Sequence, residues 1–163
     1  MVVSETDALL RVGLALLFGA AIGIERELNE KPAGLRTYML VSEGAALFMI
    51  SSILLGQEFN TGQSAPIDIS RIASTIVTGV GFLGAGMILQ SRQRVYGLTT
   101  AAGIWVAAAV GMLVGAGYLF ISLAGTVLAV LTLILPRLIE QRLGTWYAGR
   151  YHPEPPDPDE PTA

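Results

Sequence analysis

Residues 68–89 read DISRIASTIVTGVGFLGAGMIL, a segment that is apolar enough to cross a bilayer yet begins with charged side chains. As a helix, its 22 residues would extend about 33 Å, close to the thickness of a hydrocarbon core. Asp68 and Arg71 lie three residues apart, so they share a helix face. Thr75, Thr78 and Phe82 continue that face. The segment therefore predicts a transmembrane helix that carries a polar stripe.

Glycines form the second feature of this segment, at Gly79, Gly81, Gly84 and Gly86. In a soluble helix each would cost about 1 kcal/mol relative to alanine. In a membrane, small residues allow helices to approach closely or to unwind locally. Two interpretations stay open here: close packing in a helical bundle, and an ion or ligand site at an irregular turn.

The composition indicates a polytopic membrane protein. Of 163 residues, 52% are hydrophobic and only 14% are charged, and the mean hydropathy is +0.58. The chain contains no cysteine, which excludes disulfides, thiol catalysis and cysteine zinc sites. We find no Walker A, GxSxG or HExxH motif, and the only histidine, His152, lies in a proline-rich tail. An enzyme is not expected, nor is a nucleic-acid partner.

Four further membrane spans are predicted, at about 8–24, 37–56, 97–117 and 118–135, and Pro136 is expected to end the last of them. The fold class is therefore all-α, with five transmembrane helices. We expect a transmembrane domain at 1–136, a basic juxtamembrane helix at 137–150 on the membrane surface, and a disordered acidic tail at 151–163.

Basic residues alternate between the segments outside the spans. Lys and Arg number three in the first loop, none in the second, two in the third, none in the fourth and three after the fifth span. The positive-inside rule then predicts an external N-terminus and a cytoplasmic C-terminus. No basic residue precedes the first span, so a cleavable signal peptide is not expected.

Two GxxxG pairs, Gly19 with Gly23 and Gly111 with Gly115, predict close helix contacts. These faces exceed what one five-helix bundle is expected to bury, so we predict a homodimer. Near the start of the first span, Arg11 is expected to extend outward to the interface rather than to pair with Asp7.

The polar residues form two predicted layers. The outer layer comprises Asp7, Arg11, Asp68 and Arg71. For it, a structural Asp68–Arg71 ion pair and a vestibule that attracts cations are alternatives. The inner layer comprises Glu25, Arg26, Arg36, Glu43, Thr99 and Thr100.

Glu43 lies too deep in the second span for a membrane anchor, because an ionised group there costs about 2.5–3.5 kcal/mol. It is expected to lie level with Thr99 and Thr100 and to pair, ionised, with Arg26 or Arg36. A protonated carboxyl that is only hydrogen-bonded is the alternative. With Asp68, Glu43 is also the candidate Mg²⁺ ligand, although two carboxylates are too few for a dehydrated cage.

Four motifs together resemble the MgtC/SapB membrane-domain family, over residues 8–135. They are GAAIGIERE (19–27), AGLRTYMLVSEGAALFMI (33–50), the segment 68–89, and GLTTAAGIWVAAAVGMLVGAG (97–117). The residues that match the family pattern are Glu25, Arg26, Gly34, Leu35, Arg36, Thr37, Asp68, Arg71, Gly81, Phe82, Gly84, Gly86, Gly97, Thr99, Thr100 and Trp105. Glu43 departs from that pattern, and the cytoplasmic domain of longer members has no counterpart here.

The resemblance implies a multi-pass protein of the bacterial inner membrane that is linked to growth at low Mg²⁺. Some members are described as inhibiting the F-type ATP synthase. We expect a non-enzymatic modulator of a membrane partner, either that synthase or a transport ATPase. A small transporter or channel for Mg²⁺ or another solute is the alternative. Mg²⁺ is the candidate cofactor.

Overall fold

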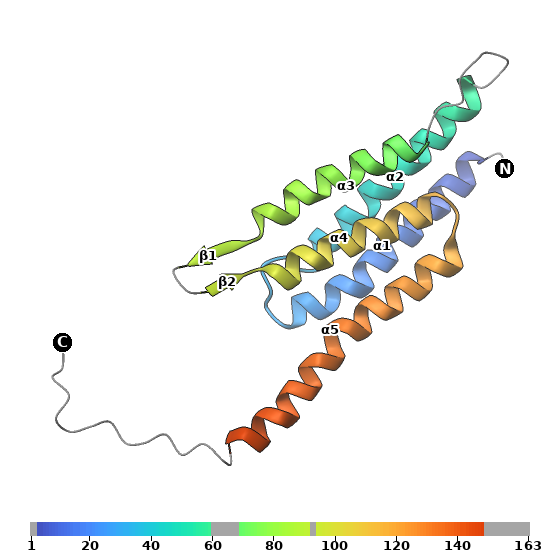
Figure 1. Cartoon of the computed structure of the whole chain (residues 1–163). Coiled ribbons are helices and arrows are strands. Elements are labelled where there is room, and N and C mark those ends of the chain that lie inside the picture. Colours follow the sequence, from blue (N-terminus) through green and yellow to red (C-terminus); the bar gives the residue numbers. More distant parts are fainter. Residues whose placement is uncertain (1–2, 60–68, 92–93, 149–163) are drawn as a thin grey trace, which may run out of the picture.

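The computed structural model describes residues 3–59, 69–91 and 94–148, and within them the chain forms five helices and one two-stranded hairpin (Figure 1). The helices are α1 (Glu5–Leu28), α2 (Leu35–Phe59), α3 (Ile69–Gly86), α4 (Leu98–Gly115) and α5 (Leu119–Ala148). The strands are β1 (Leu89–Ser91) and β2 (Arg94–Tyr96), which pair antiparallel with Leu89 opposite Tyr96. The predicted all-helical fold class is confirmed, and the structure adds one short hairpin.

Local chemistry fixes both ends of α1. The Ser4 hydroxyl accepts a hydrogen bond from the Asp7 amide at 3.2 Å, and acidic side chains occupy the first turn. At the other end Asn29 is the C-cap, and Glu30 adopts a left-handed backbone with φ of 51°. The chain can then turn through Pro32 into α2.

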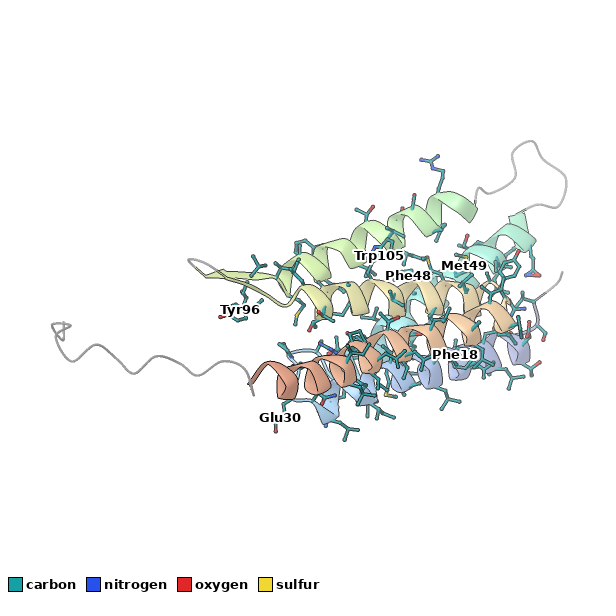
Figure 2. All side chains as sticks on the ribbon, turned by 60° about the horizontal axis from the view of Figure 1, so that its bottom comes forward. Phe18, Glu30, Phe48, Met49, Tyr96 and Trp105 are labelled. Atoms are coloured by element: carbon teal, nitrogen blue, oxygen red, sulfur yellow. The ribbon has the colours of Figure 1, made fainter. Side chains whose placement is uncertain are left out.

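The centre of the bundle is formed by α1, α2 and α4, and α3 and α5 pack on its outside (Figure 1). Small side chains dominate the contacts, with Tyr38, Ile22, Ile104 and Val114 as the largest fully buried apolar residues. We call the end that carries the α1–α2 loop and the hairpin the hairpin end, and the opposite end the α4–α5 end. Figure 2 shows Glu30 and Tyr96 at the hairpin end, with Phe18 and Met49 further along the bundle.

The GxxxG glycines bring helices together within one chain. A Cβ on Gly19 would lie 2.6 Å from the Tyr38 carbonyl oxygen, and one on Gly115 would lie 2.7 Å from that of Ala46. Gly23 meets the backbone of α2 in the same way, and Gly111 meets that of Ser42. These four glycines are therefore used inside the protomer. They do not supply the external surface on which the homodimer was predicted.

The glycines of α3 differ from these. A Cβ on Gly84 would contact Ala101 at an ordinary 3.7 Å, whereas one on Gly79, Gly81 or Gly86 would meet nothing within 4 Å. Most of the α3 glycines thus do not serve helix packing in the described structure.

Four of the described helices are long and apolar enough to cross a membrane: α1, α2 up to Glu58, α4, and α5 up to Pro136. The apolar segment of α3, Arg71–Gly86, is shorter than these four. Large apolar side chains cover the outside of the bundle, including Leu17, Phe48, Phe120 and Leu128. The chain is a membrane protein with four evident spans, and α3 is a shorter apolar helix beside them.

The predicted end of the third helix was wrong, and the predicted end of the fifth span does not coincide with the end of its helix. The third helix ends at Gly86, not at residue 89, because residues 89–91 pair with 94–96 in the hairpin. The turn between hairpin and α4 uses Gly97 at φ of 85°, where a Cβ would collide with the Met87 carbonyl. In the fifth helix, the apolar segment long enough to cross a membrane runs from Leu119 to Pro136, but the helix itself continues through Pro136 to Ala148.

Candidate functional site: a buried polar cluster at the hairpin end

The candidate site is centred on Arg26, a charged residue buried among apolar helices. Only 4% of Arg26 is exposed. Its Nη2 donates a hydrogen bond to the Thr100 hydroxyl at 3.0 Å, and its Nη1 lies 3.6 Å from Glu25 Oε2. Tyr38 of α2 donates its hydroxyl hydrogen to the Thr100 carbonyl at 3.3 Å. Three helices thus meet at one polar cluster, which we call the Arg26 cluster.

Glu25 is held in place by Asn29. The Asn29 side-chain amide donates to the Glu25 carboxylate at 2.7 Å and to the Glu25 carbonyl at 2.6 Å. The other carboxylate oxygen, Oε2, is buried and has no hydrogen bond, and the same holds for Arg26 Nε. At 3.6 Å the Glu25–Arg26 contact is therefore an electrostatic pair without a hydrogen bond. The cluster has unused bonding capacity on both its cation and its anion.

A polar cavity of about 520 Å³ lies beside these atoms. It is lined by Glu25, Arg26, Leu28, Asn29, Glu30, Lys31 and Leu133. Acidic and basic side chains are both present, so the cavity has no strong preference for ions of one sign. Its polar walls can hold ordered water against the unpaired atoms of Glu25 and Arg26.

The sequence did not single out Tyr38, Asn29 or Glu27, although each has a role here. The Glu27 carboxylate accepts a hydrogen bond from the Leu35 amide at 3.0 Å, which satisfies a free donor at the start of α2. No sequence signal marks Glu27, because it lies in the last turn of α1, eight residues before the amide that it accepts from. Tyr38 is indistinguishable by sequence from an ordinary core aromatic residue.

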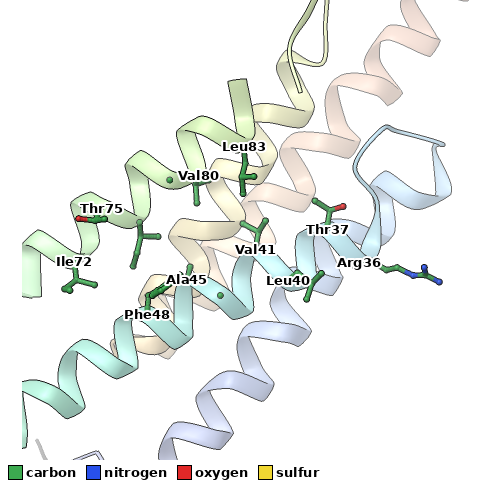
Figure 3. Close-up of a pocket in the computed structure, with 13 residues that line it drawn as sticks. Arg36, Thr37, Leu40, Val41, Ala45, Phe48, Ile72, Thr75, Val80 and Leu83 are labelled. Atoms are coloured by element: carbon green, nitrogen blue, oxygen red, sulfur yellow. The ribbon is translucent and has the colours of Figure 1, made fainter. Parts of the chain in front are cut away.

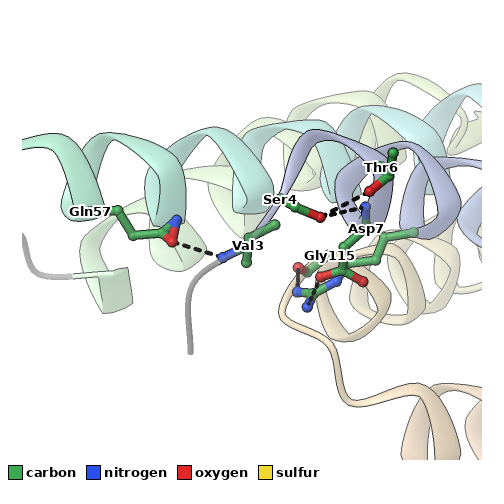
Figure 4. Close-up of polar contacts among 7 residues, drawn as sticks. Val3, Ser4, Thr6, Asp7, Gln57 and Gly115 are labelled. Atoms are coloured by element: carbon green, nitrogen blue, oxygen red, sulfur yellow. Dashed lines mark hydrogen bonds and ion pairs between the residues drawn. The ribbon is translucent and has the colours of Figure 1, made fainter.

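A second buried arginine lies at the α4–α5 end (Figure 4). Arg11 donates to Asp7 Oδ2 at 2.6 Å and to the Gly115 carbonyl at 2.8 Å. The expectation that Arg11 extends outward is wrong. Its guanidinium instead satisfies a carbonyl at the C-terminus of α4, a helix end where a positive charge is favourable. Nearby, the Val3 amide donates to Gln57 Oε1 at 2.7 Å, which fixes the chain start against α2 (Figure 4).

The remaining predicted polar residues do not join the Arg26 cluster. Thr99 and Trp105 are exposed, and Arg36 and Thr37 line a groove between α2 and α3. Arg71 is exposed on α3. Asp68 lies outside the described residues, so the Asp68–Arg71 pair stays a prediction.

On the predicted α3 stripe, the hydroxyl groups bond to their own helix. Thr75 donates to the Arg71 carbonyl at 2.9 Å and Thr78 donates to that of Ser74 at 3.0 Å. Phe82 is 81% exposed. The stripe is therefore present, but its hydroxyl hydrogens are already engaged.

Glu43 is half-buried and makes no ion pair or hydrogen bond in the described structure. The expected pairing with Arg26 or Arg36 is absent because of helix register. The neighbouring Ser42 packs against Gly111, which lies eleven residues beyond Thr100 on α4. Those residues correspond to about 16 Å along a helix. Glu43 is therefore far deeper than the layer in which it was predicted.

Among the described residues, no three or more Asp, Glu, His or Cys side chains gather where they could hold a metal ion. Glu43 and the Glu25 carboxylate lie in separate layers, and Glu25 already faces Arg26. The predicted Glu43–Asp68 metal pair stays a prediction, since Asp68 is not described.

Comparison with known proteins identifies the family. The model of the MgtC family matches residues 12–142. The chain belongs to the MgtC family. The match includes Glu25, Arg26, Tyr38 and Thr100, so the Arg26 cluster lies within the family region. No solved structure matches the chain.

Three relatives within the MgtC family show how far the similarity extends. "Putative magnesium transporter YhiD" of Escherichia coli (strain K12) is 46% identical over 127 residues, which is 78% of this chain and 59% of YhiD. SrpB of Synechococcus elongatus is 44% identical over 131 residues, 76% of this chain and 71% of SrpB. MgtC of Salmonella typhimurium (strain LT2) is 43% identical over 129 residues, 79% of this chain and 52% of MgtC. The matched part thus spans only part of each relative.

Proposed function

We propose that this protein acts in the bacterial inner membrane in adaptation to low Mg²⁺, as a non-enzymatic modulator of a membrane partner. The observation that carries the proposal is the Arg26 cluster within a member of the MgtC family. Charged groups inside a membrane protein are costly and usually mark a functional site. The name of YhiD, which describes magnesium transport, supports the connection to Mg²⁺.

The chemistry of the cluster favours modulation over Mg²⁺ permeation. Mg²⁺ prefers oxygen ligands and usually keeps several of its waters. Here the carboxylate of Glu25 faces the guanidinium of Arg26 at 3.6 Å, so a divalent cation would have to compete with a fixed positive charge. A cluster of this kind is better suited to holding three helices in one arrangement that a partner recognises.

We propose a membrane ATPase as the partner, either the F-type ATP synthase or a transport ATPase, following what the MgtC/SapB resemblance implies. The proposed topology has five crossings, with the N-terminus outside and the C-terminus in the cytoplasm. The position of the α1–α2 loop and the hairpin at the same end supports this arrangement, since both carry basic residues. Two copies of the chain are proposed to form a homodimer.

Transport of Mg²⁺ is the second candidate, because of the name of YhiD. Two measurements separate the candidates. We expect the unchanged chain to restore growth of a deletion strain at low Mg²⁺ and the Arg26→Gln chain to fail. We also expect liposomes that contain the purified protein to show no saturable Mg²⁺ uptake. Saturable uptake that Arg26→Gln abolishes would overturn the modulator in favour of the transporter.

Partner binding is tested by purification of the tagged chain from membranes grown at low Mg²⁺. Co-purification of an ATPase subunit with the unchanged chain, and its loss with Arg26→Gln, is the expected result. Recovery of the same ATPase with both chains would show that the Arg26 cluster does not control partner recognition.

A further inference from the structure

An apolar groove of about 840 Å³ lies between α2 and α3 (Figure 3). Among the described residues, its walls contain aliphatic side chains, one phenylalanine, two glycines, two threonines and one arginine, and no acidic residue. They are Arg36, Thr37, Leu40, Val41, Gly44, Ala45, Phe48, Ile72, Thr75, Ile76, Gly79, Val80 and Leu83. We call this the α2–α3 groove.

Two glycines lie on the groove walls where space is open. A Cβ on Gly44 of α2 or on Gly79 of α3 would meet nothing within 4 Å. Gly19 and Gly111, in contrast, bring backbones into direct contact. The two groove glycines therefore hold open a space that no part of the described chain fills.

The groove is open to lipid and has the depth of one leaflet. Leu40, Phe48 and Leu83 are exposed along it. From Arg36 to Phe48 the α2 wall rises by twelve helical steps, or about 18 Å. One leaflet of a hydrocarbon core about 30 Å thick extends about 15 Å. An apolar space of this length beside the bilayer matches a single acyl chain.

Arg36 supplies the charge at one end. It is the only charged residue of the groove wall, it is exposed, and it makes no ion pair or hydrogen bond with the described residues. In Figure 3 its guanidinium extends away from α2 at the end of the row of groove residues. A guanidinium presents a fork of donors that fits phosphate oxygens, and it stays charged at all relevant pH values.

We propose that the α2–α3 groove binds an anionic phospholipid, with one acyl chain between α2 and α3 and the headgroup phosphate held by Arg36. The apolar wall accounts for the chain, and the free guanidinium at its end accounts for the preference for negative charge.

Native mass spectrometry of the full chain released from nanodiscs tests the proposal. The nanodiscs contain equal amounts of phosphatidylglycerol and phosphatidylcholine with the same acyl chains. We expect retained phosphatidylglycerol in excess, and a loss of that preference by about fivefold in Arg36→Gln, which corresponds to about 1 kcal/mol. Arg71→Gln is the matched control, since Arg71 is an exposed arginine of α3 outside the groove; it should keep the preference.

Filling the groove tests the acyl chain separately. Gly79→Leu should reduce retention of both lipids, whereas Gly81→Leu, at an equally open α3 glycine outside the groove, should not. Unchanged melting temperatures in detergent show that each variant is folded. Equal retention of both lipids by the unchanged chain would overturn the role of Arg36. Equal retention in Gly79→Leu and Gly81→Leu would overturn the groove as the site.

Two other occupants give different results. In the first, inorganic phosphate stabilises the protein against unfolding in a way that depends on Arg36, and it displaces no lipid. This result would show an anion site without an acyl chain. A groove covered by a second copy would yield dimers without retained lipid, which Gly79→Leu converts to monomers. Either result would overturn the lipid proposal.

Discussion

Arg26 shows how one buried charge can organise three helices. Its guanidinium bonds α4 through Thr100 and faces Glu25 on its own helix, and Tyr38 of α2 bonds the same Thr100 residue through its carbonyl. A buried ion pair is weak evidence for stability, but removal of one partner leaves an uncompensated charge. The cluster should therefore be sensitive to single changes.

We predict that Arg26→Gln lowers the free energy of unfolding by about 3–5 kcal/mol, because Glu25 is left buried without its counter-charge. Thr100→Val should cost about 1–3 kcal/mol, since it removes only the acceptor. Unfolding of the purified protein in mixed detergent measures both. Lys31→Gln is the control at an exposed position. A change of less than 0.5 kcal/mol for Arg26→Gln, about the size expected at a surface site, would contradict the role assigned to the pair.

Glu43 leads to the opposite prediction. Because it has no ion pair or hydrogen bond in the described structure, Glu43→Gln should change the free energy of unfolding by less than about 0.5 kcal/mol. The ionised pair expected from the sequence would instead predict a loss of about 3–5 kcal/mol. The same unfolding assay decides between these values, with Arg26→Gln as the variant that must respond.

The sequence predicted only part of these residue positions. Arg26 and Thr100 were both assigned to the inner polar layer, and the structure brings them together. Glu43 was misplaced because depth was counted from the start of one helix, whereas register depends on how α2 packs against α4. Tyr38 was missed because its partner is a backbone carbonyl 62 residues away, and no side-chain pattern marks such an acceptor.

At the scale of elements, identical glycines have different roles according to the helix face they occupy. Gly111 lies where α4 touches the backbone of α2, and Gly79 faces the open α2–α3 groove. The GxxxG spacing predicted the first role correctly as a close helix contact. Nothing in the spacing of the α3 glycines distinguishes contact from open space.

We predict that Gly111→Ala destabilises the protein by about 1–3 kcal/mol, because the added methyl group forces α2 and α4 apart. Gly79→Ala should be neutral or stabilising, by up to about 1 kcal/mol of helix propensity. Melting temperatures of the two variants in one detergent give the comparison. Equal melting temperatures would show that α2 and α4 can separate without loss, contrary to the packing described here.

The sequence predicted the existence of all five helices, but not the structure between the third and fourth. Hydropathy continues through Met87 to Leu89, so the helix was extended to residue 89. Short hairpins depend on backbone pairing and on a residue such as Gly97 with a left-handed backbone. Hydropathy carries no information about either feature. In the same way, Pro136 is a strong signal for a helix end, and hydropathy did not indicate that α5 continues beyond it to Ala148.

For the whole molecule, the arrangement of its two ends makes the topology testable. Lys31 and Val95 are exposed at the hairpin end, and Tyr118 is exposed at the α4–α5 end. The chain contains no cysteine, so single cysteines can be introduced without a background signal. The positive-inside rule assigns the hairpin end to the cytoplasm.

We therefore predict that a membrane-impermeant maleimide labels Tyr118→Cys in intact spheroplasts. Lys31→Cys and Val95→Cys should react only after permeabilisation. Labelling of Lys31→Cys in intact spheroplasts, with Tyr118→Cys protected, would invert the topology. Labelling of Lys31→Cys and Val95→Cys from opposite sides would show that α2 and α3, the two helices between these positions, do not both cross the membrane.

The continuity of α5 through Pro136 has a mechanical consequence. The twelve helical residues from 137 to 148 form an arm about 18 Å long. A change of about 20° at a proline, the size of an ordinary kink, would move the tip of that arm by about 6 Å. A small change of angle at Pro136 is then amplified into a larger displacement at the C-terminal end of α5. The end of α5 beyond Pro136 can therefore report a small change of helix angle as a displacement of several ångströms.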